Sequence, residues 1–314
     1  MKARNSKARY CTSRLCGIPK YLLWAVLGLA VIVIVVPIAV MFGRKKPSTP
    51  KGTVLVPLYV YPSPGAWDPL LIAHATNTLH HDFKLTTTRI TNHPRLNFTV
   101  VVNPASGPGL EPTPDSNYTR EIPKLNQHAN VRTVGYVSTS YTNRNISLAL
   151  RDIETYSAWS ENSTIAGLGL QGIFLDETPS QYQATSAKFL DTLADSITSQ
   201  TGLGTDPLII HNPGTIPDPR YMRSANLTVV FEGAYSTYRS HGFHKTMTAF
   251  QDSAHAGRDA LACIVHSLPS TLDGHALTKD LRSSCGSAFI TGLSKDYYAS
   301  FWPGWLGFTD EMAA

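Results

Sequence analysis

Short apolar runs recur along the chain from residue 54 onward, and each run ends in polar or turn-forming residues. Most of the runs are continuous rather than alternating, which is typical of strands that are buried on both faces of a parallel sheet. The pattern predicts eight strands, at Val54–Tyr59, Phe98–Asn103, Val131–Val137, Gly172–Leu175, Leu208–His211, Leu227–Phe231, Leu261–His266 and Ser287–Thr291.

Helix-compatible stretches separate most of these strands. They are predicted at Trp67–His81, Ser147–Trp159, Gln181–Thr198, Thr246–His255 and Thr278–Ser283. The stretch after Asn103 is proline-rich and predicts no clear helix. Strands that alternate with helices favour a parallel sheet, and eight such units predict a closed (β/α)8 TIM-type barrel. An open doubly wound sheet is the alternative, but the sequence lacks its glycine-rich phosphate fingerprint.

One apolar run is much longer than a strand. Residues 21–43 carry no charged side chain, and at about 1.5 Å per residue a helix of this length spans a hydrocarbon core of about 30 Å. Arg44, Lys45 and Lys46 follow directly. The alternative is a cleaved signal peptide, whose apolar region is only about 7–15 residues long. We therefore predict a transmembrane signal-anchor helix at 21–43.

Charge and sequons set the expected orientation of this helix. Basic residues dominate positions 1–20, which predicts a cytoplasmic tail and a single-pass type II protein of the cell membrane. Residues 44–52 are then a short stalk, and residues 53–314 form an extracellular catalytic domain. Five N-x-S/T sequons lie after the helix and predict glycosylation at Asn97, Asn117, Asn145, Asn162 and Asn226.

The net charge of +5 comes from the N-terminal segment. Residues 1–46 hold nine Lys and Arg and no acid, whereas the rest of the chain has eighteen Lys and Arg against all twenty-two acids. The predicted domain is thus mildly acidic, which argues against a nucleic-acid partner. Cys263 and Cys285 lie in the predicted oxidising compartment, where they can pair. No cysteine or histidine spacing indicates a metal, and no cofactor is expected.

In a (β/α)8 barrel the active site lies at the carboxyl ends of the strands. Carboxylates follow two of the apolar runs: Asp176 and Glu177 in GIFLDETP, and Glu232 in VVFEGAY. Buried carboxylates are costly unless they are paired or functional. A helix cap for Asp176 and an ion pair for Glu232 are the structural alternatives. Two carboxylates that meet across a sugar-sized gap are what glycoside hydrolysis requires.

Amides, imidazoles and aromatic rings also gather at these strand ends. Such groups bind sugars, because rings cover the apolar face of a pyranose while amides bond its hydroxyls. We predict substrate contacts from Tyr59, Asn103, Tyr136, His211, Asn212, His266, Tyr297 and Trp302. For each histidine a buried, purely structural role is equally open, and a simple Asn-Pro turn is the alternative for Asn103. Core packing or a membrane-facing position is the alternative for Tyr297 and Trp302.

Several of these segments together resemble one known family. VLVPLYVYP, VVVNPASGPG, VRTVGYVSTSY, GIFLDETP and VVFEG occur in this order from Val54 onward, and they resemble the spherulin-4-like family, glycoside hydrolase family 135. The resemblance implies a (β/α)8 barrel with endo-acting, retaining cleavage of α-1,4-linked N-acetylgalactosamine in galactosaminogalactan. The acids of the family's DE pair and FEG motif correspond to Asp176, Glu177 and Glu232.

We expect Glu232 to be the general acid/base and Asp176 the nucleophile, with Glu177 orienting its neighbour or holding the acetamido nitrogen of the sugar. The reverse assignment, or attack by the acetamido group itself, stays open on sequence. The polysaccharide is the expected partner of a monomeric protein. The rival functions are a non-catalytic carbohydrate-binding surface protein, a structural wall protein, and a deacetylase, for which the metal-ligand spacing is missing.

Overall fold

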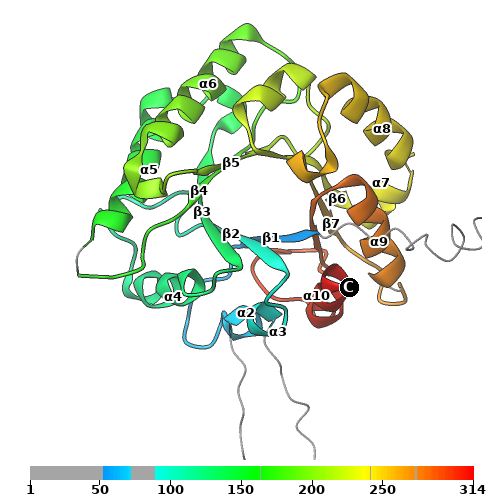
Figure 1. Ribbon diagram of the computed structural model, residues 1–314, viewed down its shortest axis with the longest axis horizontal. Helices are drawn as coiled ribbons and strands as arrows, with labels where there is room; N and C mark the ends of the chain where they lie inside the picture. The colour runs from blue at the N-terminus through cyan, green and yellow to red at the C-terminus, as the bar shows by residue number, and fades with distance from the viewer. Residues whose placement is uncertain (1–51, 72–88, 163, 241, 273) are drawn as a thin grey trace, which may run out of the picture. The chain divides into compact units, whose positions relative to one another are not determined.

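Eight parallel strands close into a barrel in the order β1-β2-β3-β4-β5-β6-β7-β8 (Figure 1). The structure is a computed structural model, and it describes residues 52–314 except 72–88, 163, 241 and 273. The strands are β1 (Thr53–Leu58), β2 (Asn97–Val102), β3 (Val131–Ser138), β4 (Gly172–Asp176), β5 (Leu208–Asn212), β6 (Leu227–Ala234), β7 (Leu261–His266) and β8 (Ser287–Ile290). All eight predicted strands are confirmed, and no end differs from its predicted position by more than three residues.

Helices surround the strands on the outside of the barrel (Figure 1). They are α2 (Asp68–Leu71), α3 (Arg89–Asn92), α4 (Ser116–Asn126), α5 (Ile146–Ala158), α6 (Ala184–Ser199), α7 (Tyr235–Ser240), α8 (Phe243–Ala254), α9 (Gly274–Ser284) and α10 (Trp305–Ala313). Short 3-10 turns lie at Ser140–Thr142, Trp159–Glu161, Thr201–Leu203, Pro219–Ser224 and Arg258–Ala260. The predicted (β/α)8 barrel is therefore confirmed.

The proline-rich stretch after β2 does contain a helix, contrary to expectation. α4 begins after Asp115, whose carboxylate accepts hydrogen bonds from the backbone N–H groups of Asn117 and Tyr118. Such a cap satisfies donors that a helix start leaves open. Pro123 lies inside this helix. The prolines that precede Asp115 therefore lie outside the helix, and Pro123 is accommodated within it.

The first predicted helix, at Trp67–His81, begins as α2, but its remainder falls outside the described residues. The predicted cytoplasmic tail and the predicted membrane helix at 21–43 also lie outside the described residues. In the part of the chain that the structure describes, no helix is long and apolar enough to cross a membrane.

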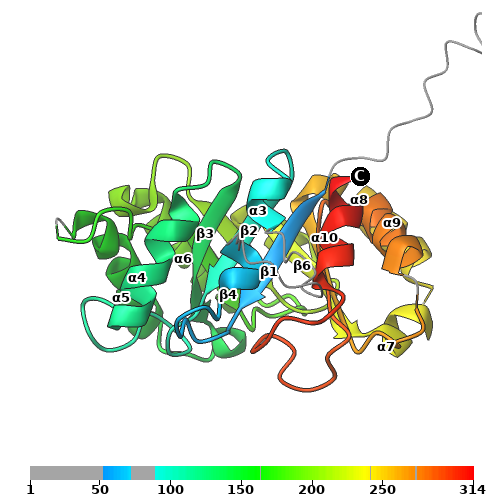
Figure 2. The same cartoon turned by 90° about the horizontal axis from the view of Figure 1, so that it is seen from below.

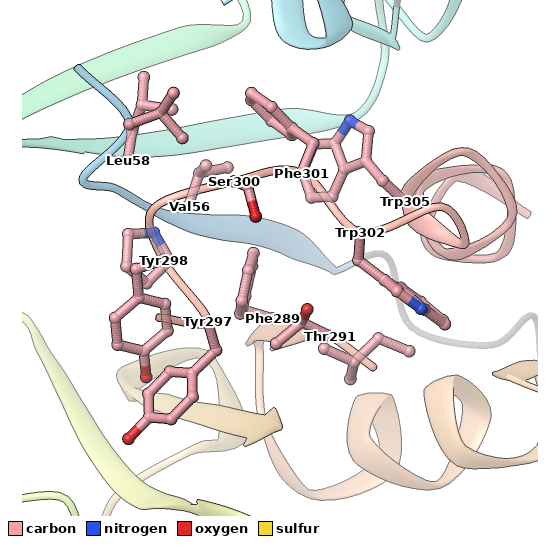
Figure 3. Close-up of a pocket in the computed structure, with 13 residues that line it drawn as sticks. Val56, Leu58, Phe289, Thr291, Tyr297, Tyr298, Ser300, Phe301, Trp302 and Trp305 are labelled. Atoms are coloured by element: carbon pink, nitrogen blue, oxygen red, sulfur yellow. The ribbon is translucent and has the colours of Figure 1, made fainter. Parts of the chain in front are cut away.

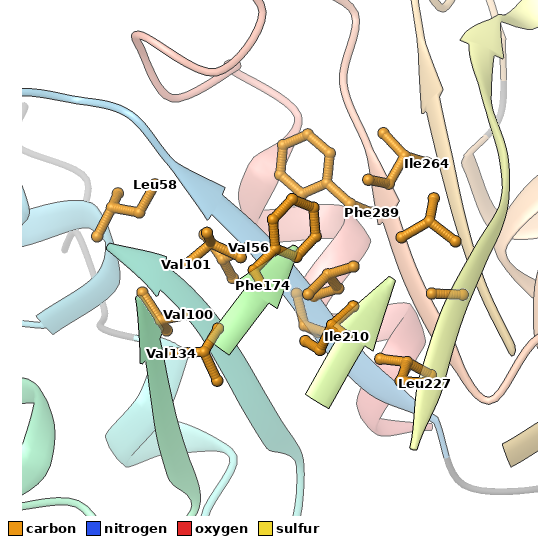
Figure 4. Packing of buried hydrophobic residues seen from close by; sticks show 14 of the residues in the cluster. Val56, Leu58, Val100, Val101, Val134, Phe174, Ile210, Leu227, Ile264 and Phe289 are labelled. Carbon is orange, nitrogen blue, oxygen red and sulfur yellow. The ribbon is translucent and has the colours of Figure 1, made fainter. Parts of the chain in front are cut away.

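Apolar side chains fill the inside of the barrel (Figure 4). Phe174 and Ile210 are paired in register across β4 and β5, while Ile264 and Phe289 are paired across β7 and β8. All four are buried. Side chains in a strand alternate between its faces, so the residue two positions after each of them also faces inward. This layer forms the floor beneath the carboxyl ends of the strands.

β1 and β8 close the barrel through only two paired positions, Thr53 with Ser287 and Val54 with Ala288. Beyond these pairs, the segment between β8 and α10 runs past the end of β1 (Figure 2). There the Tyr59 N–H donates to the carbonyl of Tyr298 at 3.2 Å. The C-terminal segment thus completes the barrel wall on the side where the active site is expected.

A disulfide joins Cys263 in β7 to Cys285 at the end of α9. Both residues are buried, and 22 positions separate them in the chain. The pairing that the sequence left open is therefore present, and it fixes α9 against the sheet.

Candidate active site

Two predicted carboxylates meet at the carboxyl ends of β4 and β6. Asp176 ends β4 and is paired in register with Asn212, which ends β5. Because Phe174 and Ile210 point into the barrel, Asp176 and Asn212 do so as well. Glu232 lies on β6, which follows β5 around the barrel. All three residues thus face the same opening.

A β-bulge turns Glu232 toward this opening. Leu227 starts β6 on the inner face beside Ile210, and strict alternation from it would point Glu232 outward. The pairing with β7 shifts by one residue between Val229 and Phe231, so Glu232 lies opposite the inward-facing Ile264. Phe231 instead points outward and packs against Tyr238 and Phe243. Re-aiming a side chain is a recognised use of such bulges.

One amide group holds both carboxylates. The Asn212 Nδ2 donates to Asp176 Oδ1 at 2.8 Å and to Glu232 Oε2 at 2.7 Å. The other end of this amide, Oδ1, accepts from the backbone N–H of Gly214 at 3.0 Å. A backbone N–H can only donate, so the amide cannot be flipped without losing this bond. Both N–H donors of Asn212 are therefore directed at the two acids.

This bridge limits the distance between the acids. The bonded oxygens of Asp176 and Glu232 cannot be farther apart than the bonds of 2.8 and 2.7 Å laid end to end. Carboxylates of retaining glycosidases lie about 5–5.5 Å apart, whereas those of inverting enzymes lie about 6.5–9.5 Å apart. The upper bound for these two oxygens lies below the inverting range and is compatible with the retaining one.

Burial raises the pKa of Asp176 above its usual value, and the nearby charge of Glu232 adds to the rise. Hydrogen bonds from the Tyr136 hydroxyl, the Glu177 backbone N–H and Asn212 act in the opposite direction, because they stabilise the carboxylate. Asp176 is thus a partly desolvated anion that accepts from three donors.

Glu177 reaches the same opening by a different route. β4 ends at Asp176, and Glu177 adopts a left-handed backbone with φ of 54°. Its side chain consequently does not point to the opposite face of the strand, and its Oε2 accepts from Ser138 Oγ on β3 at 2.6 Å. The DE pair therefore places both of its carboxylates at the carboxyl end of the barrel.

Tyrosine hydroxyls surround the acids. Tyr298 donates to Glu232 Oε1 at 2.5 Å, and Tyr136 donates to Asp176. The Tyr59 ring packs edge-on against both of these rings, with centroids 5.7 Å from Tyr136 and 5.3 Å from Tyr298. Burial raises the pKa of all three tyrosines, so that their hydroxyls stay protonated and act as donors.

His266 and Tyr297 form a flat stack beside this group. Their ring centroids are 4.2 Å apart and the ring planes differ by 5°. His266 follows Ile264 on the inner face of β7, and burial lowers its pKa, which favours the neutral ring. Tyr297 also contacts Tyr298 edge-on at 4.8 Å. Both predicted residues thus lie next to the tyrosine that holds Glu232.

His211 is a correction to the sequence prediction. Asn212 faces inward, so His211 before it points outward. There the His211 side chain is 2% exposed and interacts electrostatically with Asp191 on α6. Its Nε2 has no hydrogen-bond partner among the described residues. Desolvation lowers the pKa of His211 to about 4. A side chain buried behind the barrel wall cannot contact a substrate.

Trp302 also lies apart from the acids. Its indole packs against Gly292 and Gly304, where even an added Cβ atom would meet the ring at 2.3 Å. In Figure 3 it points away from Tyr297 and Tyr298. The cavity that these residues line has a volume of about 10 Å³, enough for about one water molecule. The packing role considered for Trp302 fits this position better than substrate contact.

Asn103 shapes a loop. Its Oδ1 accepts from the Gly107 N–H at 3.1 Å, and its carbonyl accepts from the Tyr118 hydroxyl at 3.3 Å. Sequence reasoning missed Tyr298, which holds Glu232. Tyr298 is in the DYYASFWPGW segment beside Tyr297, but its contact depends on the path of a loop.

No group of three or more His, Cys, Asp or Glu placed to bind a metal occurs among the described residues.

A barrel whose mouth holds two bridged carboxylates among tyrosines has the arrangement of a glycosidase. The chain belongs to spherulation-specific family 4, whose model matches residues 53–312. The family predicted from the sequence is therefore confirmed.

Two relatives place the chain within this family. Spherulin-4 of Physarum polycephalum is 35% identical over 187 residues, which cover 60% of this chain and 46% of that protein. The match thus spans less than half of that relative's length. The crystal structure of Aspergillus clavatus Sph3 in complex with GalNAc is 46% identical, covers 84% of this chain and 98% of that chain, and superposes with a TM-score of 0.76.

Proposed function

We propose that this protein is an endo-acting, retaining glycosidase that cleaves α-1,4-linked N-acetylgalactosamine in a galactosaminogalactan-like polysaccharide. The observation that carries the proposal is the Asn212 amide, which donates to Asp176 and Glu232 at once. It keeps the bonded oxygens of the two carboxylates close enough for a nucleophile and an acid/base on one sugar, which retaining enzymes hold about 5–5.5 Å apart.

Asp176 is the better nucleophile of the two. One of its donors is the Glu177 backbone N–H, which can never become an acceptor, so this hydrogen bond favours the ionised carboxylate and opposes the burial that raises its pKa. Glu232 accepts from a Tyr298 hydroxyl, and a hydroxyl can rotate to accept in turn. Glu232 can therefore carry a proton and lose it again, as an acid/base must.

The reaction then has two balanced steps. The Asp176 carboxylate attacks the anomeric carbon while Glu232 gives its proton to the departing glycosidic oxygen, which leaves a covalent glycosyl ester. Glu232 next takes a proton from water, whose oxygen displaces Asp176 and restores the starting configuration. In an α-linked N-acetylgalactosamine the acetamido group lies on the same ring face as the leaving oxygen. It cannot attack from the opposite face, so a protein carboxylate is needed.

Glu177 is assigned to the sugar's acetamido N–H. It faces the same opening, and its Oε2 is occupied by Ser138, which leaves Oε1 to accept from substrate. The choice of N-acetylgalactosamine rests on the Sph3 complex, since that protein is 46% identical to this chain over most of its length. The tyrosines around the acids supply flat apolar faces and hydroxyl donors.

The test is an incubation of the domain with an α-1,4-linked N-acetylgalactosamine polymer, followed by mass analysis of the fragments and NMR of the first anomer released. We expect oligomers with α configuration, and a fluorinated substrate analogue should label Asp176. Asp176→Asn and Glu232→Gln should each lower the rate by more than a thousandfold. Binding without cleavage by the unaltered protein would instead support the carbohydrate-binding alternative.

We also propose that the domain acts as a monomer outside the cell, anchored by residues 21–43. Asn97, Asn145 and Asn226 are exposed and suit glycosylation. Asn162 is half-buried, and the Asn117 Nδ2 donates to the Tyr61 hydroxyl at 2.7 Å, a bond that a glycan would replace. Intact-mass measurement before and after glycosidase treatment, on protein extracted from membranes, tests both proposals.

A further inference from the structure

Three consecutive residues after β3 have left-handed backbones. The φ angles of Ser140, Tyr141 and Thr142 are 47°, 55° and 67°. None of them is glycine, and a β-branched residue such as Thr142 is rarely found in this region. Strained conformations of this kind persist only where the surroundings hold them, and they gather at functional sites.

The turn is attached directly to the acid pair. The Tyr141 N–H donates to the Glu177 carbonyl at 2.7 Å, and Thr139 Oγ1 donates to the same carbonyl at 2.8 Å. On the far side, Thr142 Oγ1 and Ser186 Oγ are 2.7 Å apart, which ties the turn to α6. The position of the Tyr141 backbone is therefore fixed relative to Glu177.

This rigid turn presents an aromatic ring to solvent. Tyr141 is 59% exposed, and it is one of only four exposed large hydrophobic residues in the described ranges, with Tyr61, Leu110 and Leu148. Ordinary packing does not explain the strain, because the ring is largely unburied.

The ring borders a groove of about 550 Å³ between the turn and the start of α6. This volume is within the range of ligand sites, about 300–1,000 Å³. Amide side chains line it at Asn143, Gln181 and Gln183, and Phe189 contributes an apolar surface. The lining includes no Asp, Glu, Lys, Arg or His.

We propose that this groove is a subsite that binds a neutral sugar unit of the polysaccharide, away from the bond being cut, with the Tyr141 ring stacked on the sugar face. The inference rests on the proposed function, since it gives the same polymer a second point of attachment. A flat ring with three amides fits an uncharged hexosamine, and the absence of acids from the lining disfavours a deacetylated, cationic one.

A ladder of α-1,4-linked N-acetylgalactosamine oligomers, from disaccharide to octasaccharide, tests the proposal by calorimetry. The receptor is the Asp176→Asn variant, which binds without cleaving. We expect affinity to rise with length, and Tyr141→Ala in that background to weaken binding of the octasaccharide about tenfold while leaving the disaccharide unchanged. Tyr141→Phe keeps the ring and should stay within about twofold of its parent.

Leu110→Ala is the matched control, because it removes an exposed apolar side chain that does not line the groove. Gln183→Ala is a second variant for the case that Tyr141→Ala misfolds, since the Gln183 side chain makes no capping bond. Equal octasaccharide affinity with and without the Tyr141 ring overturns the subsite. Loss of cleavage by the unaltered protein, with length-dependent binding through Tyr141 retained, overturns the proposed hydrolysis and leaves the subsite standing.

Discussion

Replacing Asn212 with alanine removes an amide that donates to both acids. The substitution deletes two hydrogen bonds to carboxylates, each of a kind that contributes about 1.5–3 kcal/mol. Only the part of this energy that differs between ground state and transition state affects the rate. We therefore expect kcat/KM to fall about 10²–10³-fold, as happens when a preorganised donor is lost elsewhere. The pKa of Asp176 should rise, because the Asn212 bond lowers it.

The assay is kcat/KM on the α-1,4-linked polymer across a pH series, with thermal unfolding measured in parallel. Asn130→Ala is the matched control. The Asn130 Nδ2 donates to the carbonyls of Ile90, His93 and Leu96, and its position just before β3 places it at the opposite end of the barrel from the acids. We expect it to lower the melting temperature and to leave kcat/KM within about threefold. If folded Asn212→Ala keeps kcat/KM within threefold of the parent, the amide does not hold the acids and the reasoning is refuted.

Three further predictions concern pH and stability. The Tyr136 hydrogen bond lowers the pKa of Asp176, so Tyr136→Phe should move the acidic limb of kcat/KM to higher pH, whereas Tyr298→Phe, which loses a bond to Glu232, should leave that limb in place. Replacing Cys263 and Cys285 with serine should lower stability by about 3 kcal/mol in calorimetry, because the crosslink closes a loop of 22 positions; an unchanged melting temperature would contradict this. His211 binds a proton near pH 6.5 when unfolded but only near 4 when folded, so stability should be complete above about pH 6.5 and fall by about 3 kcal/mol toward pH 4; His211→Leu should remove this loss without lowering kcat/KM.

The apolar runs were sufficient to predict the barrel. Strands buried on both faces are continuous in hydrophobicity, and β4 and β7 stand out from their polar neighbours for this reason. The acids that end β4 and lie on β6 were found by the same argument, since a carboxylate directly after an apolar strand is conspicuous. The proline-rich start of the β2–α4 connection, together with Pro123 inside the helix, concealed α4, although Tyr118, Ile122 and Leu125 lie at helical spacing.

The remaining parts of the site depend on backbone details that a residue pattern does not show. Strict alternation would point Glu232 out of the barrel, and only the bulge in β6 points it inward. The same alternation, applied to β5 with Asn212 as the inward residue, would have excluded His211. Because Tyr141 is not a glycine, its left-handed backbone conformation could not be predicted from the residue type. Tyr298 contacts Glu232 through the fold of a loop, so no spacing rule predicts it.

The short seam between β1 and β8 has a consequence for the order in which the enzyme becomes competent. The segment that covers this seam carries Tyr298, the phenol that holds Glu232. β8 ends at Ile290, before Tyr298 in the chain, so the eight strands can pair while Glu232 still lacks its hydroxyl partner. Closure of the wall and positioning of Glu232 then occur together in folding, when the segment after β8 docks against β1.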